Sequence, residues 1–328
     1  LFLHEGGESG DIMQTLKYGE QYLGWILIGL LPFALSQVYS GTLRETGETI
    51  VPMIAGVAGV FVNLIFNYLL IYGSFGFPKL GVEGAAIATV ISQGVSGILC
   101  LVFLLTKVDI LKLKKEHFKL DPIGAKIQLN IGIPMALQFS ITAIGTMILQ
   151  AALNLLGSTV VASYTAACKV EQLVTQAFQA MGMTMATYSA QNWGIHSTKR
   201  IRKGQKTAMV LSCSYAVIIY FVVLAILPFM TSLFFDGDLT TVIGYVREYI
   251  QICGLCFIPL GMIFIYRNVL QGCGYALFPT LGGVVELISR SVFAFIAARA
   301  KSYTGICVAN ASAWVTAGIF LWIAYLFI

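Results

Sequence analysis

Charged side chains are scarce in this sequence: Lys, Arg, Asp and Glu make up 11% of its 328 residues, against about a quarter in soluble domains. Histidine is scarce too, and His4, His117 and His196 all fall outside the long apolar runs. No histidine is expected near the serine of the run GVSG from Gly94 or near the C-x-x-C pair that begins at Cys253, so a serine protease or a zinc site is not expected. The sequence also has no phosphate-binding loop. It therefore predicts a protein that is not an enzyme, has no cofactor or metal and is not driven by ATP.

Long apolar runs are abundant, and hydrophobic residues reach 58%. Nine windows are long enough to cross about 30 Å of hydrocarbon as helices of ~20 residues. Their continuity favours helices over an outer-membrane barrel, whose strands alternate. We predict an all-α, multi-pass protein of the cell (plasma or inner) membrane, with its lipid bilayer as a partner. The windows are Tyr22–Leu43, Ile50–Tyr72, Ala85–Leu105, Ile127–Leu156, Val160–Ala190, Met209–Phe235, Ile250–Leu270, Leu277–Ala300 and Ile306–Ile328.

Basic residues collect on one side of this arrangement. If the connections alternate between sides, one side receives Arg44, the lysine-rich run from Lys107, the cluster TKRIRKGQK from Thr198, and Arg267. Because Lys and Arg are retained in the cytoplasm, we predict that this side is cytoplasmic. The net charge of +5 is then a signal of topology, and a nucleic-acid partner is not expected.

A short polar interruption occurs twice, as LRETGETIVP from Leu43 and as LQGCGYALFP from Leu270. Identical Gly and Pro positions at a constant offset indicate a repeated backbone, because these residues restrict or permit particular turns. Small residues also open the last span of each repeat, in ridges that begin at Gly84 and Gly305 and let helices approach closely. At an offset of 227 residues, Tyr18, Tyr22, Pro32, Tyr39, Leu43, Gly47 and Pro52 fall on Tyr245, Tyr249, Pro259, Tyr266, Leu270, Gly274 and Pro279.

The repeated units are six spans apart, so both cross the membrane in the same sense and the repeat is parallel. The simplest architecture has two lobes of six helices related by a pseudo-two-fold axis along the membrane normal. We assign residues 1–106 to the last three helices of an N-terminal lobe, 107–126 to a cytoplasmic linker, and 127–328 to a complete six-helix C-terminal lobe. On this scheme roughly 100 residues with three further spans precede Leu1. A nine-span protein with a coincidental loop match is the alternative.

Three stretches resemble the multidrug and toxic compound extrusion (MATE) family. They are Thr49–Ser92, similar to the family's fifth and sixth helices, Gly157–Gly194, similar to its eighth helix, and the turn from Leu43 to Pro52. Within the second, Gln191, Asn192 and Gly194 match a closing Gln-Asn-x-Gly element. The resemblance covers nearly the whole chain. It implies an antiporter with two six-helix lobes that exchanges organic compounds for H⁺ or Na⁺.

One departure from the family concerns the coupling ion. Asn67 stands where family members often carry Asp, and the span Ile127–Leu156, which corresponds to helix seven, contains no acid. Some relatives are thought to hold the cation with a carboxylate on that helix, so this chain needs another ligand. Asn67 remains a candidate for substrate or coupling-ion binding by its position.

The charged residues within the spans are few and costly to bury unless they are paired or face water. Glu286 and Arg290 are four residues apart on a helix and are predicted to pair, as a structural element or as part of the pathway. Glu171 cannot face Lys169 two residues away, so it either has a partner elsewhere or binds a proton, Na⁺ or a substrate cation. Gln138 and Thr142 could line a cavity between lobes, although a Thr hydroxyl can bond back to its own helix.

These observations predict a secondary active exporter, a monomer that moves small amphipathic or cationic organic substrates by alternating access. A lipid-linked oligosaccharide flippase of similar fold is the first alternative, and a grooved, cationic cavity would favour it. A receptor or scaffold that does not transport is the second alternative, although it has no need of a two-lobe repeat.

Overall fold

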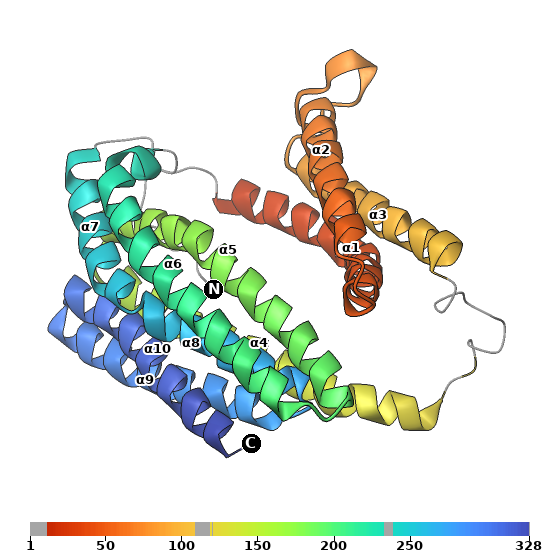
Figure 1. Ribbon diagram of the computed structural model, residues 1–328. Coiled ribbons are helices and arrows are strands. Elements are labelled where there is room, and N and C mark those ends of the chain that lie inside the picture. The colour runs from red at the N-terminus through yellow and green to blue at the C-terminus, as the bar shows by residue number, and fades with distance from the viewer. Residues whose placement is uncertain (1–11, 109–118, 120, 233–238, 328) are drawn as a thin grey trace. The chain divides into compact units, whose positions relative to one another are not determined.

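The computed structural model describes residues 12–108, 119, 121–232 and 239–327 (Figure 1). The described chain is almost entirely helical and forms two compact units, Leu1–Leu120 and Asp121–Ile328. The helices are α1 (Ile12–Glu45), α2 (Ile50–Tyr72), the 3-10 helix η1 (Ser74–Gly76), α3 (Val82–Lys107), α4 (Pro122–Asn154), α5 (Ser158–Gly194), α6 (Thr198–Ser232), α7 (Leu239–Leu255), α8 (Phe257–Gly272), α9 (Leu277–Ala300) and α10 (Tyr303–Leu326). Most of the predicted linker 107–126 lies outside the described residues.

Most helices are long and apolar enough to cross a membrane. Seven described helices meet this requirement singly, and the bent pair α7–α8 would make an eighth. The one remaining predicted span, Val160–Ala190, corresponds to α5. This helix is long but carries Lys169, Glu171 and many Gln, Ser and Thr residues. Much of α5 is nevertheless buried within the second unit, where its side chains meet other helices instead of lipid. The all-α fold is as predicted, whereas nine spans and a six-plus-six arrangement stay predictions.

Within each unit the last helix packs against the other helices of the sequence repeat, which are α1 and α2 in the first unit and α7, α8 and α9 in the second. In the first unit α3 packs along both α1 and α2, which touch each other little. In the second unit α10 packs along α9, with which it lies side by side in Figure 1, and also along α8 and α7. The remaining helices of that unit, α4, α5 and α6, pack against α9 or α8. The same packing order thus accompanies the repeated sequence.

The small-residue ridges lie at these packed seams. A Cβ atom added to Gly84 of α3 would stand 2.7 Å from the carbonyl oxygen of Leu70 in α2, and one added to Gly305 of α10 would stand 2.8 Å from the Cβ of Ala297 in α9. Leu70 and Ala297 are themselves 227 residues apart, which is the offset of the sequence repeat. Ala88 and Ala309, one turn further along each ridge, are fully buried. The ridges therefore allow close helix approach, as the sequence predicts.

The two polar interruptions form the same turn. Gly47 and Gly274 have positive φ, +94° and +87°, and each lies between a helix end and a proline in the first turn of the next helix. The amide of Gly47 donates to the Arg44 carbonyl and that of Glu48 to the Leu43 carbonyl, both at 3.0 Å. At the offset position the amides of Gly274 and Tyr275 donate to the carbonyls of Gln271 and Leu270, both at 2.9 Å. Both turns are Schellman motifs, which confirms the predicted turn geometry.

Replacing Gly274 by Ala should destabilise the protein by about 1–2 kcal/mol, because only glycine adopts positive φ without a steric cost. No atom lies within 4 Å of the added Cβ, so backbone strain alone would act. Gly244 of α7 is a suitable control, since a Cβ added there would also meet open space and its φ is helical. Thermal unfolding of the two variants should show a loss for Gly274→Ala only, and equal behaviour would contradict the role of the turn.

The span that contains Pro259 is broken, whereas its repeat partner is continuous. Helices α7 and α8 meet at Cys256 with a bend of 52°, just before Pro259 in the first turn of α8. Proline lacks the amide that would continue the helical hydrogen bonds and clashes with the carbonyl four residues earlier. Pro32, at the equivalent position, lies inside α1 without a break. A proline inside a helix commonly kinks it, and here the two equivalent prolines differ, because α1 continues past Pro32 whereas the second span breaks at Cys256, three residues before Pro259.

Candidate functional site

A cavity of about 280 Å³ lies inside the second unit. Six helices line it: α4, α5, α7, α8, α9 and α10. Aromatic and aliphatic side chains form part of the wall, including Tyr164, Phe264 and Trp314. The ionisable wall residues are two acids and two arginines, along with two tyrosines and a cysteine. The charged four are Glu171, Arg267, Glu286 and Arg290.

Glu171 is held at the cavity wall by a chain of hydrogen bonds from two other helices. The hydroxyl of Tyr249 on α7 donates to Oε2 of Glu171 on α5. The side-chain amide of Asn310 on α10 donates in turn to the Tyr249 hydroxyl at 2.9 Å. Tyr249 is fully buried, so its ring fixes the hydroxyl in position, while Glu171 is only half-buried. The arrangement presents a supported carboxylate to the cavity, and such a group can exchange a proton or bind a cation.

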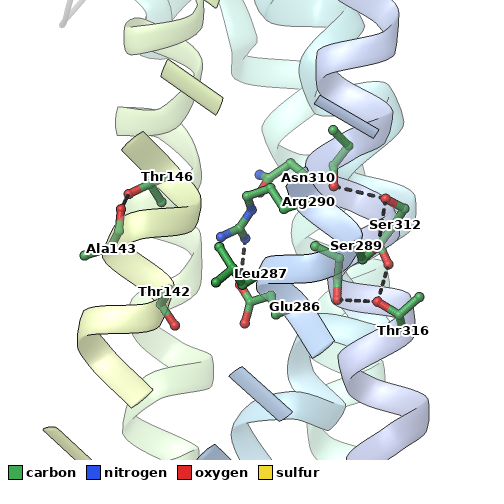
Figure 2. Close-up of polar contacts among 12 residues, drawn as sticks. Thr142, Ala143, Thr146, Glu286, Leu287, Ser289, Arg290, Asn310, Ser312 and Thr316 are labelled. Carbon is green, nitrogen blue, oxygen red and sulfur yellow. Dashed lines mark hydrogen bonds and ion pairs between the residues drawn. The ribbon is translucent and has the colours of Figure 1, made fainter. Parts of the chain in front are cut away.

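Glu286 and Arg290 form an ion pair on α9, with Oε1 and Nη2 2.6 Å apart. Figure 2 shows both side chains on the face of α9 that points toward α4, while Ser289 points toward α10. The Arg290 side chain is 3% exposed, and its Nε and Nη1 have no hydrogen-bond partner among the described residues. Gly145 leaves room for the guanidinium, since a Cβ there would stand 3.1 Å from Nη1. The pair is therefore close but incompletely hydrogen-bonded.

The structure brings some of the predicted site residues together and separates others. Thr142 lines the same cavity as Glu171, although its hydroxyl donates back to the carbonyl of Gln138 at 3.1 Å. The Gln138 side chain is buried outside the cavity, and its Oε1 accepts from Gln271 at 3.1 Å. Lys169 is exposed and does not line the cavity. Gln138 is thus hydrogen-bonded to the end of α8 and does not line the cavity that contains Glu171.

Asn67 belongs to the first unit and is described within that unit alone. Its Nδ2 donates to Oδ1 of Asn63 at 2.9 Å, one turn earlier on α2. Asn63 lines a separate cavity of about 640 Å³ formed by α1, α2 and α3, whereas Asn67 does not. Hydroxyl and amide side chains dominate that wall, and Arg44, bonded to Ser40 at 2.6 Å, is its charged member. Asn67 therefore supports a neighbour that faces a cavity.

Several polar members of the second unit's cavity are not predicted as site residues, and Tyr249, Arg267 and Asn310 are among them. Tyr249 was identified only as a repeat position, Arg267 only as a basic residue of the cytoplasmic side, and Asn310 not at all. A polar Asn directly after Ala309 of the small-residue ridge of α10 is the available signal for the last of these. Among the described residues no group of three His, Cys, Asp or Glu side chains is placed to hold a metal ion.

The sequence profile of the MatE family matches residues 7–69 and 134–296. A probable multidrug resistance protein NorM of Thermotoga maritima is 27% identical over 276 residues, covering 83% of this chain and 57% of that protein. A FAD transporter of Shewanella oneidensis is 27% identical over 262 residues, covering 78% and 56%. The chain therefore spans a little over half the length of these relatives.

Solved structures give the same fold. A crystal structure of MATE in complex with MaL6 matches 98% of this chain and 72% of its own, with a TM-score of 0.86 and 20% identity. An outward-facing multidrug resistance MATE family transporter of the MOP superfamily matches 93% and 68%, with a TM-score of 0.84 and 19% identity. These relatives are transporters rather than enzymes. Because the profile match covers more than half of its residues, the chain belongs to the MatE family of multi-pass membrane proteins.

Proposed function

We propose that this chain is part of a secondary active exporter, which moves small amphipathic or cationic organic compounds in exchange for H⁺ or Na⁺ by alternating access. The observation that carries the proposal is the Glu171 carboxylate, supported by Tyr249 and Asn310 at the wall of an internal cavity. A carboxylate so placed can hold a proton, Na⁺ or a substrate cation, one at a time. Competition between these ligands for one site is the simplest basis for exchange.

The charge of the cavity favours this proposal over a flippase. A flippase for lipid-linked oligosaccharides carries a strongly anionic diphosphate and is expected to have a cationic cavity. Here Arg267 and Arg290 are balanced by Glu171 and Glu286, and the remaining wall consists of uncharged aromatic, aliphatic, hydroxyl, amide and thiol side chains. Aromatic faces and a carboxylate suit flat organic cations. The name of the Shewanella relative adds FAD to the compounds that need testing.

The test is gradient-driven efflux by the purified full-length protein in liposomes. We expect a cationic dye to leave the loaded lumen only when an inward H⁺ or Na⁺ gradient is imposed, and ATP to have no effect. A protonophore and a sodium ionophore, added separately, identify the coupling ion. Dye efflux that depends on neither the H⁺ nor the Na⁺ gradient would contradict the proposed exporter function. Parallel assays of FAD and of a fluorescent phospholipid-diphosphate analogue distinguish the other substrates.

A further inference from the structure

The start of α6 carries a dense group of basic side chains, which we call the α6 basic cluster. All of its members are exposed and fall within the first nine residues of the helix. At about 1.5 Å per residue they occupy roughly 10 Å along the helix axis. Helix α6 contains no acidic residue, so none of its own side chains neutralises the cluster. The members are Lys199, Arg200, Arg202, Lys203 and Lys206.

The cluster lies at the end of a membrane-spanning segment. Helix α6 is long and apolar enough to cross a bilayer, and its apolar stretch follows directly after the basic residues. Trp193, at the end of α5, and Tyr275, before α9, pack edge to face with ring centroids 5.8 Å apart. Tryptophan and tyrosine concentrate at the level of lipid headgroups. This end of the second unit therefore combines an aromatic girdle with a cationic surface.

A small groove joins these two features. Its floor is formed by the buried apolar residues Ile201 and Val269, and Tyr325 of α10 stands at its edge. Arg202 and Thr198, both exposed and in the first turns of α6, form the polar side of the groove. The first amides of a helix and its dipole also favour an anion at this position. The apolar floor, the aromatic edge and the cationic rim of this groove match a molecule that has a hydrocarbon chain and an anionic headgroup.

We propose that this groove and the α6 basic cluster form a binding site for an anionic phospholipid of the bilayer. Its phosphate lies against Arg202 and the first turn of α6, and an acyl chain follows the groove past Trp193. Nucleic acids and soluble phosphates would use the cations but leave the apolar groove empty. A zwitterionic phospholipid would fill the groove but gain little from the cations, because its headgroup carries no net charge.

Tryptophan fluorescence offers a direct measurement, because Trp193 lines the groove. The purified full-length protein in neutral detergent is titrated with brominated phosphatidylglycerol or brominated phosphatidylcholine, which quench nearby indoles. The same titration of Trp193→Phe supplies the signal of all other tryptophans in the protein, Trp25, Trp314 and Trp322 included, and this signal is subtracted. We expect quenching of Trp193 at a lower concentration of phosphatidylglycerol, by about fivefold for each participating cation, and a weaker preference at high salt.

Two triple variants with equal loss of charge separate a specific site from a general electrostatic field. Lys199→Gln/Arg202→Gln/Lys206→Gln should reduce the preference to within about twofold. Arg247→Gln/Arg299→Gln/Lys301→Gln, which changes three basic residues outside the groove and the cluster, should keep it. A third variant, Lys199→Arg/Arg202→Lys/Lys206→Arg, retains the charges and should also keep the preference. Equal quenching by the two lipids, or equal losses in the first two triples, would overturn the proposal. No substrate or ion gradient is needed, so the outcome is independent of the exporter assay.

Discussion

Replacing Glu171 by Gln should lower gradient-driven dye efflux by about tenfold or more while leaving the protein folded. The glutamine oxygen can still accept the hydrogen bond from the buried Tyr249, so that polar group keeps a partner. The negative charge that binds the proton or cation is lost, and one charge-assisted interaction is worth about 1.5–3 kcal/mol, which corresponds to roughly tenfold or more. Efflux should be measured in liposomes with the imposed gradient that drives the unchanged protein.

Glu248→Gln is a matched control for this variant. Glu248 is on α7 beside Tyr249, accepts a hydrogen bond from Thr304, and does not line the cavity. Its replacement removes the same charge and should leave efflux within about twofold of the unchanged protein. If Glu171→Gln instead retains both the rate and the gradient dependence, Glu171 is structural and the coupling ion binds elsewhere in the full-length protein.

We expect a second large effect, a loss of stability, when the Glu286–Arg290 pair is broken. Arg290→Met alone leaves a buried carboxylate without its partner, and breaking a buried pair in this way costs about 3–5 kcal/mol. The double variant Glu286→Leu/Arg290→Met removes both charges and should recover most of that loss, because the pair is incompletely hydrogen-bonded to begin with. Thermal unfolding in detergent measures both variants.

Arg299→Met provides the comparison on the same helix. Arg299 is exposed in the last turn of α9 and stacks over Phe295 at 4.4 Å, so its loss should cost no more than about 1 kcal/mol. A double variant as unstable as Arg290→Met alone would mean that the pair does more than neutralise itself. A direct role in the transport pathway, the second possibility for these residues, would then be tested by efflux.

Much of the fold could be predicted from the sequence because it depends on local patterns. Long apolar runs mark helices, and the Gly47 and Gly274 turns follow from a requirement for positive φ that recurs at a fixed offset. The break at Cys256 could not be predicted in this way. Pro32 and Pro259 occupy equivalent sequence positions, yet only the second span is broken. The same residue at equivalent positions thus gives two outcomes, and the local sequence pattern does not distinguish them.

The candidate site was less predictable, since it is assembled from distant segments. Sequence spacing identified the Glu286–Arg290 pair because both residues lie on one helix, four positions apart. It also showed that Glu171 needs a partner other than Lys169. It could not identify Tyr249, 78 residues away, or Asn310, because nothing in a single sequence relates positions on different helices. Nor does the sequence show that Gln138, a polar residue in a span, is hydrogen-bonded to Gln271, which is 133 residues away.

The packing order within each unit has a consequence for biosynthesis. Helices leave the ribosome from the N-terminus onward, and the element that contacts the other repeated helices of its unit, α3 or α10, is made last. Helices α1 and α2, or α8 and α9, make few contacts with each other before that point. Each unit therefore stays incompletely packed in the membrane until its final span is inserted. A chain arrested shortly before Tyr303 would leave the side of α9 that packs against α10, including Ala297 beside Gly305, open to lipid and to quality-control proteases, even though most of the unit had already been synthesised.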